Sequence, residues 1–326
     1  MQNMPETMNS PLPDSPLISI LVISYNTREM TLECLHSVVN ETVDCSYELI
    51  VVDNNSQDGS AEAIEKEFPD IKLMALKDNL GFAKANNLAA EHASGEYVLL
   101  LNPDTVVLDK AIDRLMTFAK ERPEAGIWGG RTYYGDKSLN PYSCWRRTTV
   151  WNLFCRVSGI AGVFSKSEFL NSEAYGGWQR DSVRQVDIVT GCFFLITKEL
   201  WTDLKGFDPA FFMYGEEADL CLRAGKKGYS PMVTPNAGII HYGGASDTVQ
   251  EDKMVRLLKG KISLVKRHWS PLTRGLGAFL YLMWPVRQNI VRALLKIVSP
   301  REKFNEEAAK TWRQIWRRRN EWKNGY

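Results

Sequence analysis

Residues 97–105 are YVLLLNPDT, in which a run of apolar and aromatic side chains is followed at once by Asn-Pro-Asp. An apolar run without alternation is typical of a strand that is buried on both faces. Asn, Pro and Asp are good turn formers, so turn chemistry alone explains why such a strand ends here. The same residues also carry a carboxylate, that of Asp104, straight out of a buried strand, which favours a ligand-binding role.

The alternation of strand and helix occurs four times in the first 120 residues. Apolar runs at 18–25, 47–52, 71–76 and 97–101 are each followed by apolar residues at helical spacing, at 30–39, 60–68, 82–93 and 111–119. Buried strands separated by amphipathic helices predict an α/β fold with a mostly parallel central sheet and helices on both faces. Right-handed crossovers place every strand-to-helix loop at one edge of that sheet, where ligands bind.

The four loops at this edge are polar and rich in Asp and Asn: residues 24–27, 53–60, 78–81 and 102–105. Turn chemistry could explain any one of them, but four on one edge favour a binding site. The first strand is not followed by GxGxxG, and the chain contains no GxxxxGK[ST], which weighs against dinucleotide and P-loop binding.

Composition and patterning bound the remaining possibilities. The 326 residues carry a net charge of +1, so no global field points to nucleic acid. Six cysteines without metal-ligand spacing favour a reduced, cytoplasmic compartment, and we find no apolar run of the roughly 18–20 residues that a membrane span needs. We expect three parts: a tail at 1–16, an α/β domain at 17–248 and a basic, helical extension at 249–326.

An acidic cluster lies in the second half of the chain. The pattern predicts a helix that begins near Gly215 and ends at Gly225 or Gly228, with Glu216, Glu217 and Asp219 in its first turn. The helix dipole alone stabilises each acidic side chain in the first turn by about 0.3–1 kcal/mol. Three carboxylates beside four aromatic residues (207, 211, 212 and 214) favour a catalytic role for at least one.

Several motifs occur in a fixed order: D-N-x-S-x-D-G-S, N-x-G-F-A-x-A-N-N, L-N-P-D, T-G, G-F-D-x-x-F-F-x-Y-x-E-E-x-D-L-C-x-R and H-x-G-G-x-S. Over residues 17–246 the chain resembles the family 2 glycosyltransferases, and within them the bacterial rhamnosyltransferase-like branch. The resemblance implies a GT-A fold, a nucleotide-sugar donor, a divalent metal and inversion at the anomeric carbon.

The resemblance also implies roles for individual residues. The nucleotide-sugar site would be formed by Ser24, Asn26, Asp53, Asn79, Gly81, Phe82, Asn86, Asn102 and Asp104. Asp104 would coordinate Mg²⁺ or Mn²⁺, with His241 as the second protein ligand. Asn102 replaces the first acid of the family's Asp-x-Asp pattern, so this metal site would carry one charge fewer.

The catalytic base and the acceptor site also follow from the resemblance. The base falls on Glu217, but the chain has Glu-Glu where the family has Glu-Asp, so Glu216 stays a candidate. Thr190 and Gly191 would line the acceptor side, and Trp178 would stack on a sugar face. Three arginines (131, 146 and 147) could face a diphosphate, although a surface position is the simpler interpretation.

The C-terminal segments are apolar and basic. Residues 275–298 are largely apolar, and residues 311–322 interleave Trp312, Trp316 and Trp322 with arginines. This pattern favours a peripheral contact with an anionic membrane, at the inner face of the cytoplasmic membrane. A helical pair packed on the main domain, or a homo-oligomer contact, is the alternative, and nothing else supports nucleic acid.

The function expected from the resemblance is transfer of L-rhamnose from its thymidine diphosphate to a hydroxyl of a glycan or lipid-linked saccharide, in the synthesis of a bacterial surface polysaccharide. Another nucleotide sugar, such as a uridine diphosphate sugar, is the first alternative. A nucleotidyltransferase is disfavoured because the loop at 24–28 lacks glycine. The acidic residues argue against a third possibility, a non-catalytic nucleotide-sugar-binding subunit.

Overall fold

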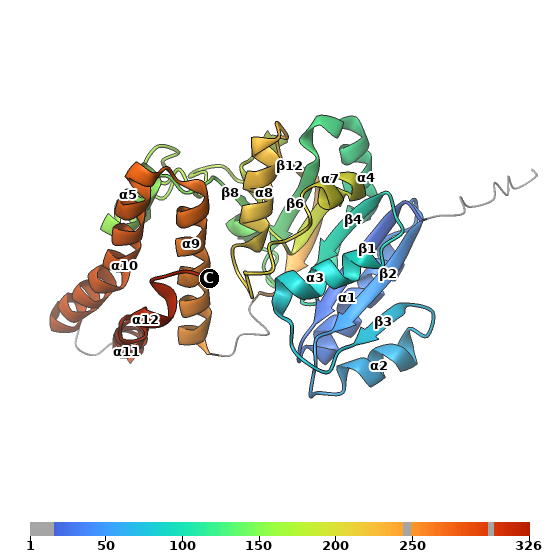
Figure 1. The fold of residues 1–326 in the computed structure, drawn as a ribbon, viewed down its shortest axis with the longest axis horizontal. Helices are drawn as coiled ribbons and strands as arrows, with labels where there is room; N and C mark the ends of the chain where they lie inside the picture. The colour runs from blue at the N-terminus through green and yellow to red at the C-terminus, as the bar shows by residue number, and fades with distance from the viewer. Residues whose placement is uncertain (1–15, 244–248, 299–302) are drawn as a thin grey trace, which may run out of the picture.

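A computed structural model describes residues 16–243, 249–298 and 303–326. The tail expected at 1–16 lies almost wholly outside the described residues, as does the expected domain boundary at 248. Figure 1 shows a sheet flanked by helices, with further helices from the C-terminal part of the chain at one side.

The first four strands form the parallel half of the sheet, as the sequence predicts. They are β1 (Ile18–Ser24), β2 (Tyr47–Asp53), β3 (Lys72–Ala75) and β4 (Tyr97–Leu101), and they lie in the order β3-β2-β1-β4. β1 pairs in parallel with both β2 and β4, and β2 with β3. Their carboxyl ends therefore meet at one edge.

The second half of the sheet is mixed. It contains β11 (Phe193–Thr197), β6 (Ile127–Tyr133), β12 (Met232–His241) and β5 (Thr105–Val107). β11 runs antiparallel to β4 and β6, β12 runs parallel to β6, and β5 runs antiparallel to β12. Because His241 pairs with Thr105 in this register, the end of β12 lies beside the Asn-Pro-Asp turn.

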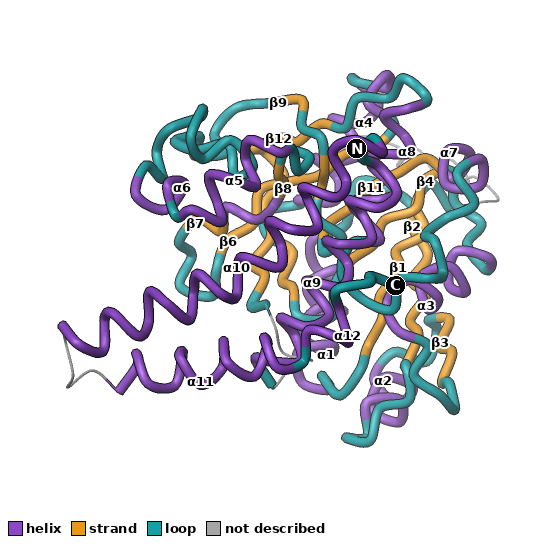
Figure 2. The backbone as a smooth tube through the Cα atoms, turned by 60° about the vertical axis from the view of Figure 1, so that its left-hand side comes forward, coloured by secondary structure: helices purple, strands orange, loops and turns teal. Residues whose placement is uncertain are grey.

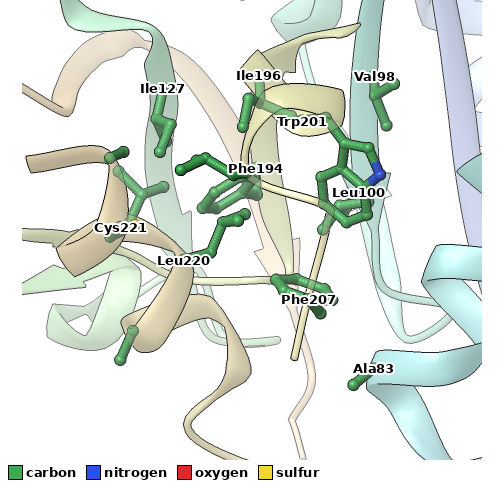
Figure 3. Packing of buried hydrophobic residues seen from close by; sticks show 14 of the residues in the cluster. Ala83, Val98, Leu100, Ile127, Phe194, Ile196, Trp201, Phe207, Leu220 and Cys221 are labelled. Carbon is green, nitrogen blue, oxygen red and sulfur yellow. The ribbon is translucent and has the colours of Figure 1, made fainter. Parts of the chain in front are cut away.

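Helices cover both faces of the sheet. One face carries α1 (Arg28–Glu41), α2 (Ser60–Glu67) and α4 (Ala111–Glu121), and the other α3 (Gly81–Glu91), α7 (Lys198–Asp203) and α8 (Glu216–Lys226). Figure 3 shows part of the second core, where Leu220 and Cys221 of α8 lie near Phe194 of β11. The helix expected from Gly215 is found as α8, with Leu220, Cys221 and Ala224 buried.

Short elements lie on either side of β6 in the chain, between α4 and β11. They are η1 (Pro123–Ala125), β7 (Leu139–Asn140), η2 (Pro141–Ser143), β8 (Cys144–Trp145), α5 (Val150–Ser158), α6 (Ile160–Val163), β9 (Arg184–Gln185) and β10 (Ile188–Val189). Of these, β7 pairs with β6 and β9 with β12, whereas β10 pairs with β8 outside the main sheet. β10 and β11 follow each other in the chain, and the turn at 190–192, which contains Gly191, lies between them.

Four helices follow: α9 (Gln250–His268), α10 (Pro271–Val298), α11 (Lys303–Arg317) and α12 (Arg319–Trp322). They share a separate core with α5, in which Leu258, Ile262, Ile315 and Trp322 are fully buried. Figure 2 shows α10 and α11 as a pair that projects from the rest of the chain. Within the described ranges, none of the helices has the length and apolar character of a membrane span.

Candidate active site

The loops after β1 and β2 are bound to each other. The backbone N–H of Asn26 donates to Ser56 Oγ at 2.9 Å, and Asn26 Oδ1 accepts from the backbone N–H of Gln57 at 2.7 Å. Asp53 accepts from Ser56 N–H through Oδ2, whereas its Oδ1 is buried without a partner. Because a buried acceptor without a partner is costly, Asp53 Oδ1 fits a ligand N–H or hydroxyl group.

Ser24, expected in the nucleotide site, has a different environment. Its side chain is fully buried and its hydroxyl lies 3.0 Å from that of Thr31 and 3.4 Å from that of Thr27. Ser24 therefore supports the loop from below, and the structure does not expose its hydroxyl to a ligand. Asn86 is likewise 1% exposed and donates to the Phe82 carbonyl of its own helix.

The start of α3 is held by asparagines. Asn79 Oδ1 accepts from Gly81 N–H at 2.9 Å and from the Asn54 side chain at 3.0 Å, while Asn54 Oδ1 accepts from Leu80 N–H. Gly81 has a φ of +76°, and a Cβ there would lie 2.4 Å from the carbonyl oxygen of Phe212. Only glycine fits this close approach between α3 and the loop before α8.

Asp104, Asn102 and His241 converge at the ends of β4 and β12. His241 Nε2 lies 3.3 Å from Asp104 Oδ1 and 3.4 Å from Asn102 Nδ2. Burial opposes ionisation of Asp104, but hydrogen bonding and the charge of His241 outweigh it, so the pKa of Asp104 lies below its usual value. Burial also opposes a charged His241, yet Cys192 and Asp104 beside it raise the pKa of His241.

These three residues suit a divalent metal that is shared with a ligand. Asn102 Oδ1 is buried without a partner. The three residues therefore offer a metal ion one amide oxygen, one carboxylate and one imidazole. In the described part of the chain no group of three or more His, Cys, Asp and Glu side chains gathers as a metal site. Mg²⁺ and Mn²⁺ accept such a sparse protein set when phosphate oxygens complete the coordination. Asn102, Asp104 and His241 therefore fit the expected Mg²⁺ or Mn²⁺ when the phosphate oxygens of a ligand complete its coordination.

Glu216 and Glu217 begin α8 in different environments. Glu216 is 4% exposed and its Oε2 is buried without a partner, whereas Glu217 is half-buried. Burial, reinforced by the charge of Glu217, raises the pKa of Glu216 well above its usual value. Burial also raises the pKa of Glu217, although backbone N–H groups and Lys261 oppose this. Of the coupled pair, Glu216 therefore holds a proton more readily and Glu217 is the better base.

The turn at 190–192 connects the acidic pair to the asparagine and aspartate. A Cβ added to Gly191 would lie 3.4 Å from the Phe82 ring and 3.8 Å from Glu217 Cβ. The backbone N–H of Asn102 donates to the carbonyl of Cys192 in the same turn. Gly191 thus leaves open space between Phe82 and Glu217, and Thr190 lies next to it.

Two sets of contacts from α9 support α8 and its surroundings, and neither was predictable from a motif in the sequence. His268 Nε2 lies 2.8 Å from Asp219 Oδ1, while Asp219 Oδ2 accepts from Arg223 at 2.7 Å. Lys261 donates to the buried Glu173 at 3.1 Å and acts electrostatically on Glu217. Asn54 is a third residue that the sequence analysis missed, although its neighbour Asp53 was a candidate.

Other candidates have contacts elsewhere. Trp178 packs edge-on against Tyr175 and lies under the guanidinium of Arg184, so its contacts belong to the segment between α6 and β10. Arg146 pairs with Glu168, and the backbone N–H of Arg147 donates to Asp187. Arg147 is exposed and Arg146 is partly exposed, as a surface position implies, whereas Arg131 is partly buried and its Nε has no partner. Trp178 as a sugar-stacking residue stays a prediction.

Comparison with solved structures defines the class of fold. A mannosyltransferase from Pyrobaculum calidifontis, PcManGT, determined with GDP-Man and Mn²⁺, superposes with a TM-score of 0.57 at 16% identity, covering 95% of this chain and 88% of that one. The fold is therefore of the GT-A type. The sequence model described as "Glycosyl transferase family 2" matches residues 19–187, more than half of the chain, and the chain belongs to this family.

Several curated proteins are similar to this chain. One is an uncharacterized protein, y4gI, of Sinorhizobium fredii (strain NBRC 101917 / NGR234), 26% identical over 79% of this chain and 28% of that protein. Another is the N-acetylglucosaminyl-diphospho-decaprenol L-rhamnosyltransferase of Mycobacterium tuberculosis (strain ATCC 25618 / H37Rv), 26% identical over 60% of this chain and 66% of that protein. O-antigen biosynthesis protein RfbC of Myxococcus xanthus is 26% identical over 72% and 18%. The matches span less than two thirds of each relative.

Proposed function

We propose that the protein is an inverting, metal-dependent glycosyltransferase that moves a sugar from a nucleotide diphosphate to a hydroxyl of an acceptor saccharide. The observation that carries the proposal is the turn at 190–192: a Cβ on Gly191 would lie 3.8 Å from Glu217 Cβ, and the Cys192 carbonyl accepts from the Asn102 N–H. The turn thus lies beside both the proposed base and a residue of the proposed diphosphate site. That spacing suits an acceptor hydroxyl between the base and the anomeric carbon.

The reaction is a single displacement. Glu217 takes the proton of the acceptor hydroxyl while the acceptor oxygen forms a bond to the anomeric carbon. The bond from that carbon to the diphosphate oxygen breaks, and its electron pair leaves with the nucleoside diphosphate. Attack opposite the leaving group inverts the anomeric configuration. A divalent ion held by Asp104 and His241 would supply positive charge to the departing diphosphate.

The donor half of the site is assigned to the loops after β1, β2 and β3. Asp53 Oδ1, an unpartnered buried acceptor, would receive a base N–H or ribose hydroxyl, and Asn26 and Asn79 hold the neighbouring backbone. Phe82 lies against Gly191 and would border the sugar. We retain Ser24 and Asn86 as supports of this pocket, since both side chains are buried.

The preferred donor is thymidine diphosphate L-rhamnose. This choice rests on the motif pattern and on the similarity to the mycobacterial L-rhamnosyltransferase. The acceptor would be a glycan or a lipid-linked saccharide of a bacterial surface polysaccharide, as the names of that relative and of the O-antigen protein suggest. A lipid-linked acceptor would require the protein to work at the cytoplasmic surface of a membrane.

Calorimetry with nucleotide sugars tests the donor site. Thymidine, uridine and guanosine diphosphate sugars are titrated into the full chain with and without Mn²⁺, and into Asp104→Asn. We expect selective, Mn²⁺-enhanced binding of thymidine diphosphate rhamnose, and loss of the enhancement in the variant. Selective binding of a uridine-linked sugar would overturn the rhamnose assignment and keep the enzyme. No binding of any donor would overturn the proposed function.

A further inference from the structure

The exposed side of α10 is an apolar stripe. Its members recur every three or four residues along one face of the helix: Leu272, Leu276, Phe279, Met283, Val286, Ile290 and Leu294. Met283 and Val286 are partly buried, and Met283 also packs against the core that α10 shares with α5, α9 and α11. Leu272 is 93% exposed, and Phe279, Ile290 and Leu294 are each more than half exposed. Over 22 residues, at about 1.5 Å per residue, the stripe extends for roughly 33 Å. The spacing places no charged residue of α10 within it.

The opposite side of α10 is used in packing. Leu280 and Tyr281 are buried in the core shared with α5, α9 and α11, and Pro285 is buried as well. The Trp284 ring packs at a tilt against Trp312 of α11, and Asn289 donates to the Trp312 carbonyl. Apart from Met283, the residues of the apolar stripe take no part in this core.

The neighbouring helix α11 adds positive charge on the outer side. Lys310, Arg313 and Arg317 are exposed and lie on one face of α11, with Glu307 as an acid on the same side. The buried residues of α11 pack toward α9 and α10, so this basic face, like the apolar stripe, is turned away from α9. Figure 2 shows the two helices side by side along much of their length.

We propose that this surface, the apolar stripe of α10 together with the basic face of α11, docks the protein in the plane of an anionic lipid bilayer. The stripe would lie among the acyl chains near the headgroups, and the basic face would contact anionic headgroups. This proposal adds a docking surface to the proposed location at a membrane. It rests on the proposed function only for its biological setting. It corrects the sequence-based expectation, because Trp322 is buried and Trp312 packs on Trp284.

A second copy of the chain is the competing occupant, and charge disfavours it. A two-fold contact that pairs the α10 helices antiparallel would bring the basic faces of both α11 helices to the same side of the interface. Like charges at a rim raise the free energy of association, whereas anionic headgroups lower it. The stripe is also one helix wide, which suits insertion into a bilayer surface better than burial of a broad interface.

Deletion of the C-terminal helices is a poor test. Ile315 and Trp322 are fully buried against Leu258 and Ile262 of α9, so removing residues from 270 onward would expose a core. Substitution of exposed side chains avoids this problem. Phe279→Glu/Ile290→Glu places two charges in the stripe, and Val39→Glu/Val183→Glu makes the same changes at exposed positions of the main domain.

The experiment is flotation of the full chain with vesicles of phosphatidylcholine alone or with 30% phosphatidylglycerol, without donor. We expect wild type and the Val39/Val183 variant to float with the anionic vesicles, and Phe279→Glu/Ile290→Glu to lose binding by about 100-fold or more. Lys310→Gln/Arg313→Gln/Arg317→Gln should lose about fivefold per residue and most of the salt dependence. Thermal melts identify any variant that fails to fold.

Three results would overturn the inference. One is wild-type protein that stays unbound with anionic vesicles. Another is equal binding by wild type and Phe279→Glu/Ile290→Glu. The third is a dimer in solution that this variant dissociates, which would assign the stripe to a second copy. Since donor is absent, none of these results bears on the transferase activity, which donor titration tests separately.

Discussion

Replacement of Glu217 by Gln separates the base from its neighbour most directly. Gln keeps the shape of the side chain and its place between the α8 N-terminus and Gly191, but it cannot accept the acceptor's proton. General base catalysis contributes about 10²–10⁴-fold. We therefore expect kcat to fall by that factor, or roughly 3–5 kcal/mol of transition-state stabilisation, with donor affinity nearly unchanged.

The matched control is Glu216→Gln, which changes the same chemical group one residue earlier. Burial and the charge of Glu217 raise the pKa of Glu216 well above its usual value, so the site favours the neutral form of this side chain. The neutral amide of Gln resembles that form, and we expect kcat to stay within about tenfold of wild type.

The pH dependence gives a second readout of the same pair. Burial raises the pKa of Glu217, and the base acts only when ionised, so kcat should fall as pH drops through that raised value. Glu216→Gln should keep this acidic limb, whereas residual activity of Glu217→Gln should lack it. Initial rates of nucleoside diphosphate release from pH 4.5 to 9 measure both. Full turnover by Glu217→Gln, with loss in Glu216→Gln, would refute the assignment of the base.

Two further predictions concern the frame of the site. Gly81→Ala should lower stability by about 1–3 kcal/mol and weaken donor binding, since φ is +76° and the new Cβ would meet the Phe212 carbonyl; an unchanged melting temperature would contradict this. Glu173→Gln should cost about 3–5 kcal/mol in urea unfolding at pH 7, because it leaves Arg156 and Lys261 without their buried partner. Burial opposes ionisation of Glu173, but Arg156 and Lys261 outweigh it, so the pKa of Glu173 is lowered in the folded protein. The stabilisation by ionised Glu173 is therefore present above the unfolded pKa of about 4.5 and is lost as the pH falls below that value. The destabilisation caused by Glu173→Gln should accordingly be smaller at pH 3.

Much of the fold followed from hydrophobic patterning. The runs that form β1, β2 and β4 are near-continuous because these strands are largely buried on both faces, and each of them, like the edge strand β3, lies at its expected place. α8 was recognisable because glycines lie near both ends of a segment in which Leu220, Cys221 and Ala224 form one apolar face. The antiparallel position of β11 between β4 and β6 was not predictable from the sequence, since strand order depends on long-range packing.

The loops that form the site were predictable from the sequence, whereas the residues that hold these loops and α8 in place were not. Ser24 lies at a strand end like Asp53, yet its hydroxyl is buried against Thr31, and position in a loop motif does not reveal which way a side chain turns. Lys261 and His268 come from α9 and reach α8 only through tertiary packing. Trp322 follows a run of arginines but is fully buried, because the fold of α12 turns it toward Ile315.

The most direct test of the account is transfer itself, measured with its stereochemistry. The full chain is incubated with Mn²⁺, thymidine diphosphate β-L-rhamnose and a panel of saccharide acceptors that includes a diphosphate-linked lipid, and the product's anomeric configuration is read by NMR. We expect a metal-dependent product with inverted configuration, greatly reduced in Glu217→Gln and Asp104→Asn. A product with retained configuration, or one formed equally well by Glu217→Gln, would contradict it.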